Sequence, residues 1–296
     1  MKLKVNHRIA KEIVLRLQHA FTRREGLLSE VSDLVENQIP DNVEHLSFEH
    51  ASFLFYIVSN DHGMKSTRLY DRAKELYYNA PDLFDPLKVL ETFSGPEDER
   101  LLELTGNPLG TRYPKQTAKS WYINSEKLIT DFDASPVILF QCSHNAGELL
   151  KKIVSFRGYG PKTGGMLLRA IVGLGFNKLN GMENVLVPVD IHDSRISFYT
   201  GMVHIENDRS SRKTSIDYYS YVRDIQQILL DTCNSSNISW LDVDRALWLI
   251  GSRGCVNKKC INCPLNEWCE IGKEIMKPKN SQKDLQLSLN HDDISI

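Results

Sequence analysis

The chain has 296 residues, of which 41% are hydrophobic and 25% charged, the composition of an ordinary globular protein. Its formal net charge of −2 excludes a strongly basic, histone-like nucleic-acid binder. No apolar stretch with a small-residue cleavage site opens the sequence, and the longest apolar runs, such as residues 53–58, are too short to span a bilayer. We therefore expect a soluble, intracellular protein without a targeting signal.

Apolar residues recur with helical spacing along nearly the whole chain. In chain order, helices are expected at about 7–20, 27–39, 48–59, 65–80, 86–94, 97–105, 114–131, 145–156, 161–175, 191–201, 214–231 and 240–252. The best strand candidate is 184–189, but Pro188 within it disfavours a position in a sheet. The predicted fold class is therefore all-α.

Residues 156–165 read FRGYGPKTGG and connect two amphipathic helices. Gly158 and Gly160 permit a tight reversal of the chain and let backbone N–H groups approach an anion near the start of the second helix. Pro161 suits the first position of that helix. The pattern predicts a turn between helices that fits a DNA phosphate.

Lys162 stands in the first turn of that helix, where the helix dipole is positive and carboxylates are preferred. This position favours the neutral amine, which is the form that a nucleophilic lysine needs. A phosphate contact, or an exposed charge without a role, is the alternative for Lys162.

Asp190 directly precedes the helical stretch at 191–201. Aspartate is a favoured N-cap residue, so a purely structural role is one interpretation. A carboxylate facing a cleft could also stabilise the positive charge on a sugar whose N-glycosidic bond is breaking, and could help to deprotonate a nucleophile. Lys162 and Asp190 are therefore the candidate catalytic residues.

Four of the six cysteines fall within one short segment, Cys255-x4-Cys260-x2-Cys263-x5-Cys269. In an intracellular chain, such clustering favours a metal site over disulfides. Four thiolates in one loop can wrap a compact iron–sulfur cluster, whereas zinc sites with four cysteines usually use two separated C-x2-C pairs. Zinc remains the alternative metal.

Two of these segments resemble a known family. FRGYGPKTGGMLL is similar to the G-x-G-x-K-T-A hairpin of the helix–hairpin–helix DNA glycosylases of the endonuclease III superfamily, and VPVDIH resembles the P-V-D-x-H segment of their 8-oxoguanine branch. The resemblance extends over about residues 45–270. It implies that Lys162 is the lysine that forms a Schiff base and that Asp190 is the essential aspartate. Because monofunctional members carry Ser, Tyr or Trp in place of this lysine, it also implies combined glycosylase and AP-lyase activity.

The chain departs from the family's pattern in three places. Lys162 and Asp190 are further apart than in the commonest members, and Gly164 stands where alanine is usual. The cysteines match the family's C-x6-C-x2-C-x5-C except that the first gap is shorter. The resemblance favours a [4Fe–4S] cluster on these cysteines, with Lys258 and Lys259 presented to phosphate. The identity of the excised base stays open.

The segment FLFYIVSNDHGMKS resembles the family's L-S-Q-x-T element, whose polar residue wedges into the duplex. Asn60 matches the wedge position, and Asp61 and His62 are candidates for the pocket that receives the extruded base. His192, shortly after the aspartate, is a further pocket candidate. The alternatives are a plain helix end at 60–63 and a role in supporting the fold for His192.

The expected architecture is two helical lobes with the helix–hairpin–helix at the cleft between them. Residues 1–44 are expected to pack with the C-terminal lobe, 45–180 to form a helical barrel, 181–276 to form the C-terminal lobe with its cysteine loop, and 277–296 to be a mostly disordered tail. The predicted activity is removal of a damaged or modified base from double-stranded DNA by a monomer in the nucleoid of a prokaryotic cytoplasm. The alternatives are a monofunctional DNA glycosylase and a non-catalytic helix–hairpin–helix protein that only binds DNA.

Overall fold

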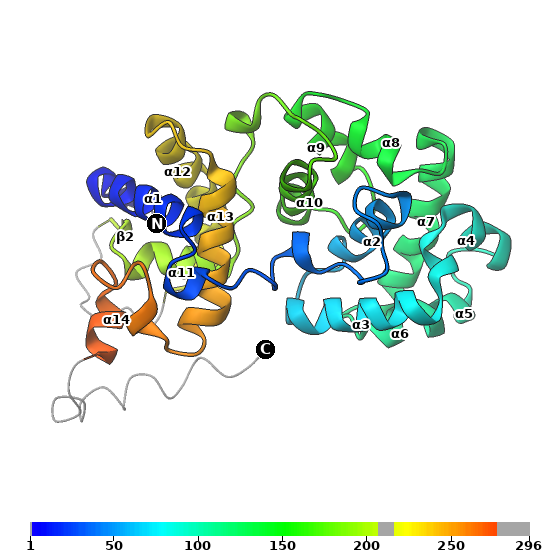
Figure 1. Ribbon diagram of the computed structural model, residues 1–296, viewed down its shortest axis with the longest axis horizontal. Coiled ribbons are helices and arrows are strands. Elements are labelled where there is room, and N and C mark those ends of the chain that lie inside the picture. The colour runs from blue at the N-terminus through cyan, green and yellow to red at the C-terminus, as the bar shows by residue number, and fades with distance from the viewer. Residues whose placement is uncertain (1, 207–215, 277–296) are drawn as a thin grey trace. The chain divides into compact units, whose positions relative to one another are not determined.

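The computed structural model describes residues 2–206 and 216–276 (Figure 1). The protein is mostly helical, with 65% helix and 3% strand, which confirms the predicted all-α class. The chain divides into two compact units: a terminal unit made of Met1–Val31 and Leu186–Ile296, and a central unit made of Ser32–Val185. None of the helices that the structure describes is both long and apolar enough to cross a membrane.

Two expectations fall on residues without a description. The predicted tail at 277–296 lies outside the described residues, and so do the first residues of the helix expected at 214–231. The rest of that helix is present as a short 3-10 turn, Tyr218–Tyr221, followed by α12 (Val222–Ser235).

The central unit consists of helices joined by short connections. Its α-helices are α2 (Phe48–Val58), α3 (Ser66–Asn79), α4 (Pro86–Thr92), α5 (Glu99–Leu101), α6 (Asn107–Leu109), α7 (Pro114–Phe132), α8 (Pro136–Gln141), α9 (Ala146–Val154) and α10 (Pro161–Leu174). Shorter helical turns of 3-10 or π type lie at Val35–Asn37, Pro81–Phe84, Leu102–Gly106 and Met182–Asn184.

Helix α2 forms the core of the central unit, in contact with α3, α8 and α10 (Figure 1). Every residue from His50 to Val58 is buried, as expected for a helix that is apolar on all sides. Tyr56 stacks on Trp121 of α7, with ring centroids 4.6 Å apart. The helix begins at Ser47, whose Oγ accepts a hydrogen bond from the backbone N of His50 at 3.1 Å. This cap confirms the helix start that the sequence predicts.

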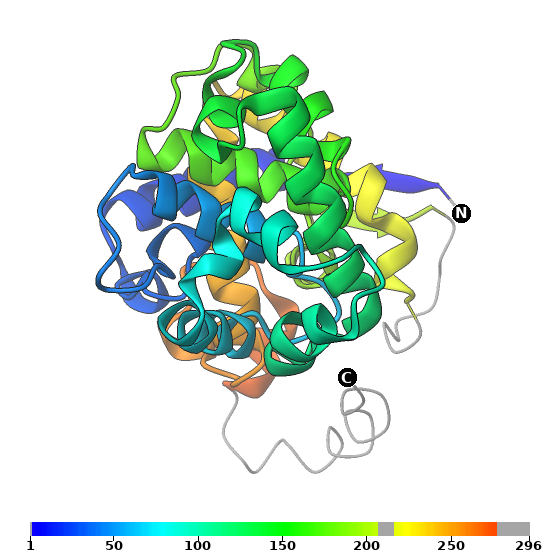
Figure 2. The same ribbon diagram turned by 90° about the vertical axis from the view of Figure 1, so that its right-hand side faces the viewer.

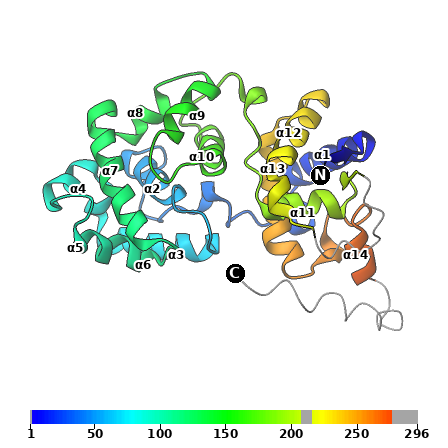
Figure 3. The ribbon, with the colours of Figure 1, turned by 180° about the vertical axis from the view of Figure 1, so that it is seen from behind.

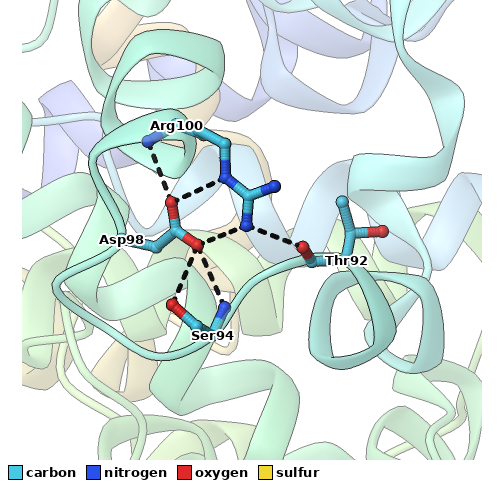
Figure 4. A network of polar contacts seen from close by, with 4 residues as sticks. All are labelled: Thr92, Ser94, Asp98 and Arg100. Carbon is cyan, nitrogen blue, oxygen red and sulfur yellow. Dashed lines mark hydrogen bonds and ion pairs between the residues drawn. The ribbon is translucent and has the colours of Figure 1, made fainter.

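The connection between α4 and α5 is closed by a polar network around Asp98 (Figure 4). Asp98 accepts hydrogen bonds from the backbone N and Oγ of Ser94 and from the backbone N, Nε and Nη2 of Arg100. Arg100 Nη2 also donates to the carbonyl of Thr92. The Arg100 guanidinium and the N–H of Ser94 hold the pKa of the Asp98 carboxyl well below its ordinary value. These hydrogen bonds fix the path of the chain from Thr92 to Arg100.

The terminal unit combines the first helix with the C-terminal helices. Its elements are β1 (Leu3–Val5), α1 (His7–Thr22), a 3-10 turn at Gly26–Leu28, α11 (Ile191–Tyr199), β2 (Val203–Ile205), α12, α13 (Trp240–Leu249), a π-helical turn at Ile250–Cys255, a 3-10 turn at Cys260–Asn262 and α14 (Glu270–Ile275). Helix α1 packs on α12 and α13 (Figure 3). Strand β1, the arrow beside the N label in Figure 2, pairs antiparallel with β2, with Lys4 opposite His204.

Segment 27–39 is not the helix that its apolar spacing predicts. Two single turns form there instead, Gly26–Leu28 and Val35–Asn37. Between α10 and this segment lies a buried ion pair, in which Nε of Arg169 is 3.1 Å from Oε1 of Glu36. A helical pattern is a weak preference that such tertiary contacts override.

The division between the units differs from the expected lobe boundary at residue 44. Residues 32–44 belong to the central unit. Gln38 Nε2 donates to the carbonyl of Ser32 at 2.7 Å, and Lys74 of α3 donates to Oε1 of Gln38 at 3.1 Å. These bonds and the Glu36–Arg169 pair attach the segment to α3 and α10.

The sequence pattern does not predict the shortest elements. The β1–β2 pairing and α8 are three and six residues long, which is too short for a clear period. The strand candidate at 184–189 joins no ladder among the described residues.

Candidate functional site

The glycine turn, residues 155–160, joins α9 to α10 in the central unit. Gly158 has φ +84°, and a Cβ at this position would lie 3.1 Å from the carbonyl oxygen of Ser59. Both facts require glycine there. Gly160 has φ −114° and ψ −174°, which any residue adopts, and a Cβ there would meet nothing within 4 Å. The protein itself therefore requires Gly158 and leaves the space around Gly160 open.

The turn is fixed to its neighbours from two sides. Asn124 of α7 accepts a hydrogen bond from the backbone N of Arg157 and donates one to its carbonyl, both at 2.9 Å. Tyr159 is buried, and its hydroxyl donates to the carbonyl of Phe55 in α2 at 2.5 Å. The sequence does not single out Asn124, whose only signal is a buried amide inside an amphipathic helix.

The first turn of α10 leaves backbone donors unused. Thr163 Oγ1 accepts from the N of Gly160 at 3.0 Å and lies 3.4 Å from the carbonyl oxygen of Gly158. Pro161 occupies the first helical position, as predicted, and has no N–H. The N–H groups of Lys162 and Thr163 find no acceptor within the part of the chain that the structure describes. Two free amides at a helix N-terminus favour an anion.

Lys162 itself is half-buried at this helix start. Its side chain makes no hydrogen bond or ion pair with any described residue. A partly exposed lysine needs no carboxylate partner, because its amine can extend into water. The amine is thus available to a group from outside the protein.

Asn60 and its neighbours adjoin the turn through Ser59. Asn60 is buried, its Nδ2 donates to the carbonyl of Tyr56 at 2.9 Å, and its Oδ1 accepts from Thr117 Oγ1 at 2.8 Å. Asp61 is also buried and accepts from Ser66 Oγ at 2.7 Å, whereas His62 is exposed. Insertion of Asn60 into a duplex would first have to break its internal bonds. The wedge and pocket roles of these residues stay predictions.

Asp190 begins α11 in the terminal unit. Its Oδ1 accepts hydrogen bonds from the backbone N of His192 at 2.7 Å and of Asp193 at 3.2 Å, while Asp193 Oδ2 accepts from the N of Asp190 at 2.9 Å. This reciprocal cap confirms that Asp190 is the N-cap of α11. Its Oδ2 accepts no hydrogen bond from the residues described and remains able to face a positive charge.

His192 packs where α11 meets the π-helical turn before the cysteines. A Cβ on Gly251 would lie 2.6 Å from the Cβ of His192, so glycine is needed for this approach. His192 Nδ1 accepts from Nη2 of Arg195 at 3.0 Å, because a guanidinium has no acceptor. His192 therefore supports the packing of α11. Its place in a base pocket stays a prediction.

The cysteine loop, residues 255–269, is held by the N-terminal part of the same unit. A Cβ on Gly26, which has φ +53°, would lie 2.3 Å from the carbonyl oxygen of Asn262. Trp268 Nε1 donates to Oε2 of Glu12 in α1 at 3.1 Å. These contacts position the loop backbone through the protein alone. Lys258, one of the two predicted phosphate contacts, has a positive φ of 54° in this loop, and Lys259 follows it.

The four thiols of the loop are electrostatic neighbours. Burial raises the pKa of Cys255 to about 12 and that of Cys263 to about 11, and the other thiols of the loop add to both shifts. The pKa of Cys260 is raised in the same way. Cys269 Sγ accepts a hydrogen bond from the backbone N of Gly272 at 3.3 Å and so caps the start of α14.

The four thiols of this loop are a donor set that suits a metal group. Among the described residues, no group of three or more His, Cys, Asp or Glu side chains is arranged to hold a metal ion. The [4Fe–4S] cluster and its zinc alternative therefore stay predictions.

The predicted residues fall into two groups. The turn, Lys162 and Asn60 lie in the central unit, and Asp190, His192 and the cysteine loop lie in the terminal unit. Comparisons with protein-family models, curated proteins and solved structures give no match, so the function proposed below is based on the residues of the chain itself.

Proposed function

We propose that the chain is a DNA base-excision glycosylase with associated AP-lyase activity, built as two helical lobes with a helix–hairpin–helix at residues 156–165. Its substrate is double-stranded DNA that contains a damaged or modified base. The observation that carries the proposal is Lys162, a half-buried lysine without a partner among the described residues, beside two free backbone amides. The open space at Gly160 lets a phosphate approach these amides.

In the proposed reaction, the lone pair of Lys162 Nζ forms a bond to C1′ of the sugar. The electrons of the C1′–N bond leave with the base, which takes up a proton. The C1′–O4′ bond of the sugar then breaks, O4′ takes up a proton from Nζ, and the imine between Nζ and C1′ is formed. Loss of a proton from C2′ expels the 3′ phosphate and breaks the strand, which is the lyase step.

Asp190 has the role of stabilising the positive charge that develops on the sugar as the base leaves. Its Oδ1 is used by the cap of α11, and its Oδ2 accepts no bond from a described residue. The role requires Asp190 and Lys162 to reach the same nucleotide. Asn60 is proposed to wedge into the duplex, and Asp61, His62 and His192 are proposed as groups that contact the extruded base.

The four cysteines are proposed to hold a [4Fe–4S] cluster, with zinc as the alternative. When bound, such a group would cross-link the loop and present Lys258 and Lys259 to phosphate, with no task in the chemical step. We expect protein purified without oxygen to be yellow-brown, to absorb at about 400 nm and to contain iron. One zinc per chain with negligible iron would instead identify the alternative metal.

Borohydride trapping tests the catalytic proposal, because hydride reduces the imine to a stable amine and leaves protein joined to DNA. Duplexes with oxidised purines, oxidised pyrimidines, mismatches and modified bases are first screened with the wild type. On the true substrate, Lys162→Gln should bind DNA and form no adduct. Lys178→Gln, which removes an exposed lysine after the end of the same helix, is the matched control and should be trapped like the wild type.

The other outcomes separate the alternatives. An adduct from Lys162→Gln at the wild-type rate would mean that another amine is the nucleophile. Base release with an intact strand and no adduct identifies a monofunctional glycosylase. Tight binding of every duplex without base release identifies a non-catalytic DNA-binding protein.

A further inference from the structure

A row of basic residues on α7 lies beside the glycine turn and has no role in the chemistry above. We define the α7 row as Lys115, Lys119 and Lys127 of α7 together with Arg157 of the turn. Lys115 and Lys119 are four residues apart and so project from neighbouring positions of one helix face. Lys115 and Arg157 are exposed, and Lys119 and Lys127 are partly exposed.

Two hydrogen bonds attach this row to the turn. Nη2 of Arg157 donates to Oε1 of Gln116 at 3.1 Å. Nζ of Lys127 donates to Oγ of Ser155 at 2.8 Å, at the other end of the same stretch of α7. The row therefore continues directly from the residues that precede Gly158.

The length of the row suits an extended polyanion better than a small anion. Twelve residues separate Lys115 from Lys127, which corresponds to about 18 Å along the axis of an α-helix. Phosphates of one DNA strand follow one another at about 3.4 Å along the duplex axis. Lys127 lies about 120° around the axis from Lys115, so a strand that follows the curved surface of α7 can meet the row at several phosphates.

Two exposed carboxylates adjoin the row: Glu126, which directly precedes Lys127 on α7, and Glu97, which lies against Lys119. Glu97 forms an ion pair with Lys119, although its side chain is 78% exposed. Lys119, and more weakly Lys115 and Arg157, hold the pKa of Glu97 below its ordinary value. Glu97 directly precedes Asp98, whose network fixes the connection between α4 and α5 (Figure 4).

We propose that the α7 row binds the phosphate backbone of nucleic acid next to the glycine turn, and that Glu97 neutralises part of the row in the free protein. The proposal rests on the DNA binding of the proposed function and not on its chemistry. Nucleic acid is the expected partner because the row is continuous with the free amides of α10. DNA binding then exchanges the Glu97–Lys119 ion pair for a phosphate contact, so Glu97 weakens non-specific binding.

The test is a titration of a lesion-free duplex over a range of salt concentrations. Each lost phosphate contact lowers the slope of log K against log salt by about 0.9, so the double variant Lys115→Ala/Lys119→Ala should flatten it by about 2 units. Glu97→Gln should tighten binding at low salt by up to about fivefold, the upper end of the range for release of one surface ion pair. Circular dichroism checks that each variant is folded.

Lys88 and Glu91 offer matched controls, because they form an exposed ion pair on α4 of the same unit at 2.9 Å. Lys88→Ala should lower the slope by far less than a full contact, and Glu91→Gln should change affinity by less than about twofold. Equal effects at the two glutamates would show a general charge effect and overturn the proposal for Glu97.

The outcomes distinguish this proposal from the enzymatic one. An unchanged salt slope in the double variant, with borohydride trapping intact, contradicts the α7 row alone. If the double variant flattens the salt slope but the wild type releases no base, only the proposed glycosylase activity is contradicted. A wild type that binds no duplex at low salt contradicts both.

Discussion

The starts of α10 and α11 differ in what accepts hydrogen bonds from the backbone N–H groups of their first turns. At α11, the carboxylate of Asp190 accepts from the backbone N of His192 and of Asp193, so the chain satisfies its own helix end. At α10, Gly160 offers no side chain, and the N–H groups of Lys162 and Thr163 have no acceptor among the described residues. A lysine replaces the acidic residue that a first helical turn prefers. The difference indicates that the protein's own groups cap the start of α11, whereas the start of α10 leaves two backbone donors for the phosphate proposed above.

Further along α10, a buried ion pair attaches the helix to segment 27–39. Arg169 pairs with Glu36, and their side chains are 4% and 8% exposed. Arg169→Leu should therefore lower the free energy of unfolding by about 3 to 5 kcal/mol, because it leaves a buried carboxylate without its cation. Urea unfolding measures the change. The exposed Arg8 is the control, and Arg8→Leu should cost at most about 1 kcal/mol. Equal losses for the two variants would show that α10 needs no such anchor.

At the closed start of α11, two substitutions separate chemistry from capping. Asp190→Asn keeps a good cap, since asparagine and aspartate are equally favoured there, but removes the charge. Base release on the true substrate should fall by at least about a hundredfold, as on removal of a key electrostatic group. Asp190→Ala should lose as much activity and in addition about 0.5 to 2 kcal/mol of stability. Wild-type base release by Asp190→Asn would leave the residue with its structural role alone.

Helix α2 of the central unit contains a buried histidine, His50, which should make the stability of the protein depend on pH. This residue is 2% exposed, and burial, with a smaller contribution from the positive charge of His45, lowers its pKa to about 4. The unfolded chain, with an ordinary pKa of about 6.5, binds more protons between pH 6.5 and pH 4. Stability is thus complete above pH 6.5 and is lost as the pH falls through this window.

We expect the free energy of unfolding to decrease by about 2 kcal/mol from pH 7 to pH 5 through His50. Urea unfolding of wild type and of His50→Gln at the two pH values measures this term, which the variant should lack. His62→Gln serves as the control, since His62 is exposed. The same pH dependence in His50→Gln and wild type would rule out His50 as its source.

The smallest expected changes in stability come from alanine substitutions of the two glycines of the turn. Gly158→Ala should cost about 1 to 2 kcal/mol, because φ +84° is unfavourable for any residue with a Cβ and because Ser59 is close. Gly160→Ala should leave stability within about 0.5 kcal/mol of wild type, since its backbone conformation is ordinary. Its Cβ would nevertheless stand where a phosphate approaches the free amides, so duplex binding should weaken. Unchanged DNA affinity in Gly160→Ala would argue that the start of α10 binds no phosphate.

The sequence alone determined the features that depend on neighbours three or four residues away. The helix expected at 114–131 forms at Pro114–Phe132, and the one expected at 7–20 forms at His7–Thr22. The cap at Asp190 and the proline at the start of α10 are also where the pattern predicts them. Helical periodicity and capping act within one turn, so the order of residues is enough to reveal them.

The tertiary structure decided every feature whose partners are distant along the chain. Glu36 and Arg169 are buried together from segments far apart, and their pairing replaces the expected helix at 27–39 by two short turns. The two glycines of the turn look equivalent in the sequence, but the nearness of Ser59 makes only Gly158 necessary to the fold. Asn60, expected to wedge into DNA from the surface, is buried and accepts a hydrogen bond from Thr117. Such burial and pairing depend on which segments pack together, and no local pattern contains that information.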